Sequence, residues 1–192
     1  MKAIRLFLLA TVPAAFSFAG IITYSTSLSG PNESPPNGST ATGFAIVTID
    51  DIANTMEVNV TFQGLSSNNT AAHIHCCTAV AGTGTAGVAT VTPTFTGFPS
   101  GTTAGTYDNI FDMTVAGSYN PAFVTANGSS VPTAMSVLFA GIASGNSYLN
   151  IHTTNFGGGE IRGFLAPVPE PGTWLLTLAG FGVLWAAKRK LA

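Results

Sequence analysis

Basic residues are almost missing from the body of this chain. Charged residues make up 7% of its 192 positions, against about 25% in an ordinary soluble protein. Five of the six lysines and arginines lie within the first five or the last five positions, and Arg162 is the single cation between residues 20 and 168. Nucleic-acid binding needs clustered lysine and arginine to displace counterions from phosphates. The composition therefore excludes nucleic acid as a partner.

Apolar runs are also short, below the ~20 residues that span a bilayer. At the start, Lys2 and Arg5 precede an apolar stretch over residues 6–18, and small residues stand at the −3 and −1 positions of a cut before Gly20. This pattern predicts a secretory signal peptide over residues 1–19, which implies the Sec translocon and signal peptidase as partners. An uncleaved membrane anchor is the alternative interpretation.

The C-terminal end, residues 168–192, has three parts in a fixed order. A proline-rich spacer contains Pro169, Glu170 and Pro171, an apolar segment expected to form a hydrophobic helix follows over residues 174–187, and basic residues close the chain. Basic residues after an apolar segment stay on the cytoplasmic side. The apolar part is short for a permanent span, so we expect only a transient stay in the inner membrane. A plain short C-terminal anchor is the alternative.

This end resembles the PEP-CTERM sorting signal of bacteria that export exopolysaccharide-associated proteins. The resemblance covers residues 168–190, because the Pro-Glu-Pro triplet, the apolar run and the basic tail occur together. It implies recognition by an exosortase, cleavage near residues 169–173, and transfer to the cell surface or matrix. The protein would then be membrane-associated before processing and extracellular after it, with exopolysaccharide or surface proteins as partners.

Residues 20–167 predict one all-β domain, an antiparallel sandwich or barrel. Short alternating apolar runs separated by turn residues are typical of this class. A 3–4 residue apolar spacing predicts one short helix over residues 133–143. We expect strands at about 21–28, 43–50, 56–62, 72–76, 87–91, 111–115, 147–152 and 160–165. We expect a core of Ile22, Phe44, Ile46, Val58, Val60, Phe62, Ile74, Val88, Phe111, Val137, Leu138, Leu149, Ile151, Ile161 and Leu165.

Three segments of this body together resemble a CHRD domain, a module named from chordin and also found in bacteria. They are an opening with a glycine, a glutamate and paired prolines over residues 28–36, the His-x-His stretch 72–75, and a closing hairpin over 148–153 and 159–163. The resemblance implies an immunoglobulin-like or related β fold, and it implies little about activity. The adjacent cysteines after the His-x-His stretch depart from this pattern.

Strand alternation predicts one polar face on this domain. Because side chains alternate sides along a strand, His73 and His75 lie opposite Ile74. By the same rule, the closing strands place their polar residues opposite Leu149, Ile151 and Ile161. The predicted polar face consists of His73, His75, Asn150, His152, Glu160 and Arg162, with all three histidines of the chain.

Two interpretations of this face stay open. Two histidines at i and i+2 with a third from another strand are a workable ligand set for Cu or Zn, and Glu160 could complete it or support it. The structural alternative pairs Arg162 with Glu160 and leaves the histidines in a hydrogen-bonded network that sets the strand register. On the second interpretation Glu33, near the paired prolines, is a solvated loop carboxylate.

Only two cysteines are present, Cys76 and Cys77, and an exported protein should hold them oxidised. They can pair with each other or with other molecules, although opposite parity on a strand disfavours pairing unless the strand ends before them. No Gly-x-Ser-x-Gly elbow is present, and no acid pair is evidently arranged for glycoside hydrolysis. We therefore expect a non-enzymatic exported surface or matrix protein, with a Cu- or Zn-binding exported protein as the alternative.

Overall fold

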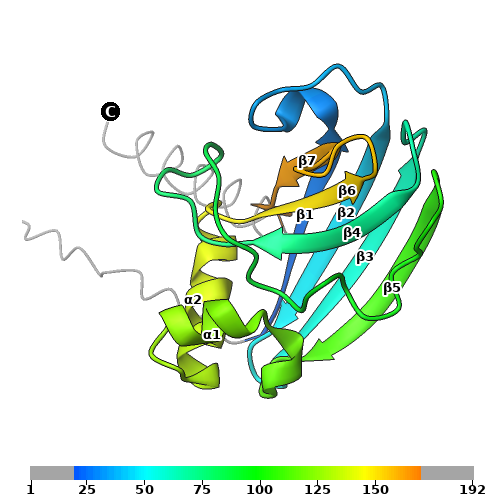
Figure 1. The fold of residues 1–192 in the computed structure, drawn as a ribbon. Helices are drawn as coiled ribbons and strands as arrows, with labels where there is room; N and C mark the ends of the chain where they lie inside the picture. Colours follow the sequence, from blue (N-terminus) through cyan, green and yellow to red (C-terminus); the bar gives the residue numbers. More distant parts are fainter. Residues whose placement is uncertain (1–19, 170–192) are drawn as a thin grey trace, which may run out of the picture.

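The computed structural model describes residues 20–169, which form a curled antiparallel sheet with two helices at one end (Figure 1). The predicted signal peptide, Glu170, Pro171, the hydrophobic helix and the basic tail lie outside the described residues. The strands are β1 (Ile21–Ser29), β2 (Thr42–Asp50), β3 (Thr55–Gln63), β4 (Asn69–His75), β5 (Gly105–Asp112), β6 (Tyr148–Thr153), β7 (Ile161–Phe164) and β8 (Ala166–Pro167). The helices are α1 (Pro121–Ala126) and α2 (Val131–Ala143), with 3-10 turns at Gly30–Asn32 and Ala116–Ser118.

The sheet order is β4-β6-β7-β1-β2-β3-β5, and β8 pairs with β1. All these pairs are antiparallel. The predicted all-β sandwich or barrel class is confirmed, and the sheet has the form of a half-barrel. Within residues 20–169, no helix combines the length and the apolar character that crossing a bilayer would require.

Local sequence explains where the elements turn. The β2–β3 hairpin closes because the Asp50 carboxylate accepts hydrogen bonds from the backbone N–H groups of Ile52 and Ala53 at 3.0 and 2.8 Å, while Asn54 takes a positive φ of 55°. Helix α2 starts where the Ser130 hydroxyl accepts from the Thr133 N–H. The predicted helix is therefore real and starts two residues earlier than expected.

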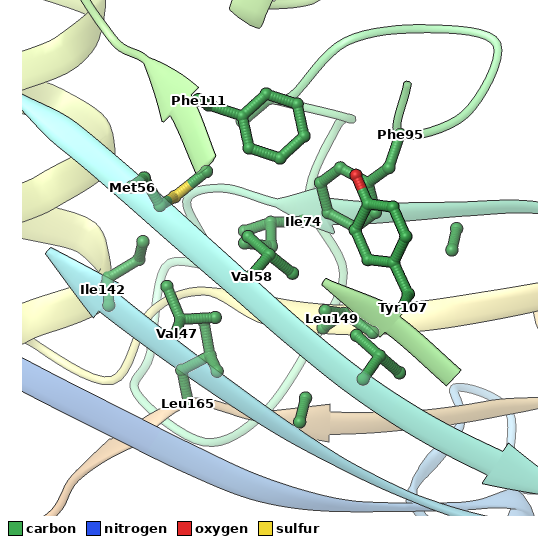
Figure 2. Packing of buried hydrophobic residues seen from close by; sticks show 14 of the residues in the cluster. Val47, Met56, Val58, Ile74, Phe95, Tyr107, Phe111, Ile142, Leu149 and Leu165 are labelled. Atoms are coloured by element: carbon green, nitrogen blue, oxygen red, sulfur yellow. The ribbon is translucent and has the colours of Figure 1, made fainter. Parts of the chain in front are cut away.

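The core lies inside the curl, between β2 and β3 on one side and β4 and β6 on the other (Figure 2). The segment between β4 and β5 runs from one open edge of the sheet to the other. It brings Phe95 against Tyr107 and Phe111, with ring centroids 5.8 and 5.6 Å apart. The Phe95 N–H also donates to Ala72 O on β4. This segment therefore closes the half-barrel with side chains where strand pairing is missing.

Several expectations for the core and strands were wrong. Phe44 and Ile46 are 44% and 36% exposed, because they lie on the outer face of β2 while Ala45 and Val47 face the core. Ile22, Val88 and Val137 are only half-buried. The stretch 87–91 makes isolated bridges instead of a strand, β5 ends at Asp112 where a strand over 111–115 was expected, and α1 was missed. The other ten predicted core residues are buried.

Candidate metal centre

The three histidines meet on the outer face of the β4–β6 pair. The register places Ala71 opposite His152, His73 opposite Asn150, and His75 opposite Tyr148. Their sequence neighbours Ile74, Leu149 and Ile151 are fully buried on the other face. Alternation along two paired strands thus separates an apolar core face from a polar face, as the residue pattern predicted.

The histidine cluster, defined as His73, His75 and His152, is compact. One ring nitrogen from each residue lies within 4.8 Å of the others. The centroid of the His73 ring is 5.9 Å from that of His75 and 5.3 Å from that of His152. His73 and His75 are buried and His152 is half-buried. The cluster therefore lies largely out of solvent, and His152 is its most exposed member.

Backbone carbonyls fix the tautomer of each ring. Nε2 of His73 lies 2.6 Å from Pro93 O, Nδ1 of His75 lies 2.9 Å from Ala86 O, and Nδ1 of His152 lies 2.9 Å from Gly157 O. A carbonyl only accepts, so each of these nitrogens carries the proton. The other nitrogen of each neutral ring keeps its lone pair. These other nitrogens, Nδ1 of His73 and Nε2 of His75 and His152, have no hydrogen-bond partner among the described residues.

Burial keeps all three rings neutral. Desolvation lowers the pKa of His73 to about 4, opposed by its hydrogen bond to Pro93 and reinforced by the neighbouring histidines. Burial likewise lowers the pKa of His75, and the Ala86 carbonyl opposes it. The pKa of His152 is lowered by burial against the effect of Gly157 O. At pH 7 the cluster therefore offers lone pairs, which is the protonation state that metal ligands need.

This arrangement suits a first-row transition metal. Neutral imidazoles bind Zn and Cu, and a ligating histidine usually donates its other N–H to a carbonyl or carboxylate, as all three do here. Zn–N bonds of about 2.0–2.1 Å in a tetrahedron put ligand nitrogens about 3.4 Å apart. The ring nitrogens lie within 4.8 Å of one another, so the separation between any two would have to shorten by at most about 1.4 Å to hold the ion.

Two of the remaining predicted polar-face residues, Asn150 and Arg162, have different surroundings. Asn150 lies on the cluster's face between His73 and Arg162 in the register. Arg162 turns toward the neighbouring aromatic rings, with its guanidinium carbon 4.7 Å from the Tyr148 ring centroid and 5.5 Å from that of Phe164. Tyr148 in turn stacks on His75 at 4.7 Å. An aromatic ring therefore stands between the cation and the cluster.

The expected ion pair between Glu160 and Arg162 was wrong. Glu160 precedes β7, which begins only at Ile161, so strand alternation does not govern its direction. Its carboxylate accepts hydrogen bonds from the hydroxyl groups of Ser39, Ser66 and Thr153 at 2.7, 3.0 and 2.7 Å. Burial alone would raise the pKa of Glu160, but these hydrogen bonds and one from the Ser66 N–H outweigh it and lower the pKa. Glu160 is thus a structural acceptor that ties three segments together.

The ion-pair partner of Arg162 is Glu33, where Glu160 was expected. The expectation of a solvated loop carboxylate was wrong, because Glu33 is 7% exposed and its Oε2 lies 3.8 Å from Nε of Arg162. Burial raises the pKa of Glu33 to about 7, with Arg162 opposing the rise. Arg162 also donates to the carbonyls of Asn32 and Gly84. It therefore holds two loops distant in sequence against β7.

Cys76 and Cys77 form a disulfide with each other. Strand β4 ends at His75, so the opposite parity of a strand no longer separates the two side chains. The sulfur atoms pack against α2 at Gly141, where a side chain would collide with both. The disulfide thus packs the end of the His-x-His strand against helix α2.

Sequence reasoning missed the groups that orient the histidines. Pro93, Ala86 and Gly157 act through backbone oxygens, which leave no residue-type signal. The stacking of Tyr148 on His75 follows from the β4–β6 register, which an alternation argument alone does not supply. The one available signal for Gly157 was the glycine run after the closing strand, which is typical of a tight loop.

The fold and the site define an antiparallel β domain with a three-histidine cluster on its outer face. The sequence description of the CHRD domain matches residues 24–165, most of the chain. The protein belongs to the CHRD domain family. No curated protein and no solved structure matches the chain.

Proposed function

We propose that this protein is an exported, surface- or matrix-associated CHRD protein that binds a Zn or Cu ion at the histidine cluster. Two observations carry the proposal: one ring nitrogen from each histidine lies within 4.8 Å of the others, and each ring has a buried nitrogen without a partner among the described residues. Buried acceptors without partners are rare in native proteins. A cation bound by the three rings would supply the missing partner.

The role proposed for the domain is binding, without catalysis. In support, the partner of every ring N–H is a backbone carbonyl, whereas a nucleophilic mechanism needs a hydroxyl or thiol within reach of a histidine base. A hydrogen-bond network without metal, the structural alternative, would require the cluster's three free nitrogens to find donors. Among residues 20–169 they find none.

The export route is the second part of the proposal. What supports it is the pattern of residues 1–19 and 168–192 together with membership of a family of secreted-type domains. On this route the Sec translocon, signal peptidase and an exosortase act in turn, and the mature domain meets exopolysaccharide or surface proteins. Fractionation of the producing cells with mass spectrometry of both chain ends tests this. A full-length, uncut chain in the cytoplasm would overturn it.

Metal content is tested on the full chain, purified in mild detergent without a histidine tag. We expect about one Zn or Cu per chain by mass spectrometry of the dialysed protein, and loss of that metal in His152→Ala. His152 is the half-buried member of the cluster, so its removal leaves the covered strand β4 intact. Thr154→Ala, an exposed change on the same hairpin, is the matched control and should keep the metal. Equal metal in all three proteins would contradict the proposed site.

A further inference from the structure

Buried polar atoms without partners gather at one place in this fold. Six such side-chain atoms occur within residues 20–169, and only Ser147 Oγ lies apart from the polar face and its rim. The other five are Nδ1 of His73, Nε2 of His75, Nε2 of His152, Oδ1 of Asn150 and Oε1 of Glu33. A metal ion on the histidines accounts for three of them. Asn150 and Glu33 still lack partners.

Asn150 lies on the same face as the cluster. It is directly across from His73 in the β4–β6 pair and two residues before His152 on the same strand. Asn150 is 2% exposed, and its amide oxygen is an acceptor. That oxygen therefore suits a donor lying beside the metal, such as a bound water.

Gly159 packs tightly against Asn150 and Glu33. A Cβ placed on Gly159 would lie 2.5 Å from Glu33 Oε1 and 2.8 Å from Asn150 Nδ2, so only a glycine fits beside these two side chains. Glu33 also borders a surface hollow together with Pro36 and Phe156. Asn150 is therefore the unpartnered group that lies beside the histidines, and Glu33 lies at the rim.

The histidine cluster offers three protein ligands and no fourth among the described residues. Among the described residues, the group of metal-ligating side chains holds no cysteine, aspartate or glutamate beside the three histidines. Zinc sites with four protein ligands are closed, whereas sites with three keep a position for water or another ligand. The three-histidine set therefore belongs to the second kind.

We propose that the bound metal ion keeps a fourth coordination position that holds water and admits small inorganic anions. Asn150 Oδ1, which has no partner among the described residues, accepts a hydrogen bond from that water. This inference rests on the proposed function, because it requires metal on the histidine cluster. It adds a ligand class to the site: water, hydroxide or a small anion that exchanges with them.

Cobalt(II) is the probe, because its visible absorption responds to coordination number and ligand exchange. The full chain in mild detergent is stripped with chelator, loaded with Co²⁺ and titrated with azide. We expect a saturable spectral change in the wild-type protein. In Asn150→Leu the water loses its acceptor while azide loses nothing, so we expect azide to bind about two- to tenfold more tightly, the equivalent of one net hydrogen bond. Asn59→Leu, a half-buried asparagine on β3, is the matched control and should bind azide like the wild type.

The outcomes separate the two claims. If Co²⁺, Zn²⁺ and Cu²⁺ all fail to bind, the proposed function falls, and this inference with it. If Co²⁺ binds with one-to-one stoichiometry but azide leaves the spectrum unchanged, the metal site stands and the open position is wrong. If azide binds equally well to the wild type and Asn150→Leu, with circular dichroism unchanged, the role of Asn150 is wrong.

Discussion

Replacing Glu33 by glutamine should stabilise the domain at neutral and alkaline pH. Glu33 is 7% exposed, its Oε1 has no partner among the described residues, and the nearest cation, Nε of Arg162, is 3.8 Å from Oε2. Burial raises its pKa from the ordinary 4.5 to about 7, although Arg162 opposes the rise. Desolvation of the charged carboxylate therefore exceeds its attraction to the guanidinium.

The sign and size follow from proton linkage. Between pH 4.5 and about 7 the folded state keeps the Glu33 proton while the unfolded state loses it, so the free energy of unfolding falls as pH rises through this range. Below pH 4.5 the group is protonated in both states and contributes nothing. A pKa rise of this size corresponds to about 3 kcal/mol. Glutamine has nearly the same shape and carries no charge, so it avoids this cost.

Urea denaturation of the chelator-treated protein between about pH 5 and pH 8 measures the effect. Glu33→Gln should match the wild type within about 1 kcal/mol at the acid end and exceed it by about 1–3 kcal/mol at the alkaline end. Glu57→Gln, on the half-exposed side of β3, is the control and should show no such trend. The reasoning is refuted if Glu33→Gln is the less stable protein at pH 8, because the ion pair with Arg162 would then dominate.

Two further outcomes concern the helix contact and the histidines. Gly141→Ala places a methyl group against the sulfurs of Cys76 and Cys77 and should lower the free energy of unfolding by about 1–3 kcal/mol. Gly117→Ala, with open space around it, is the control and should change that free energy little. Equal thermal midpoints for the two variants would contradict the packing. Metal affinity should persist below pH 6.5, where an ordinary histidine becomes charged, and should fall toward pH 4 as His73 is protonated. Calorimetric titration with Zn²⁺ at a series of pH values checks this. A loss of affinity centred at pH 6.5 would count against neutral, buried rings.

Alternation along the strands is what made much of this fold predictable. The runs around Val58 and Val60 and the His-x-His stretch alternate strongly, so both strands and the side on which the histidines lie could be inferred. The convergence of His152 with the other two needed the β4–β6 register, which pairs segments more than 70 residues apart in the chain. Family resemblance placed the two segments in one domain, and only the structure gives their register.

The failures have specific physical reasons. In β2 both faces carry apolar side chains, so alternation could not decide whether Phe44 and Ile46 or Ala45 and Val47 face the core. Glu33 looks solvated because its own segment is polar and proline-rich, and its burial comes from residues around Gly159 and Arg162, over 120 positions away. Glu160 lies one residue before its strand begins, where the period of two no longer applies.

The sheet order also dictates when the histidine cluster is completed. A chain made from its N-terminus can form β1, β2 and β3 as a local meander, yet the only named strand beside β4 is β6, which starts at Tyr148. His73 and His75 are therefore synthesised long before β6, the strand that holds them in place. The slow, non-local pairing of β4 with β6 must finish before His152 can meet the other two rings. Under the proposed function, metal capture by all three rings would be a late event in the life of the chain, and it would mark a domain that has finished assembling.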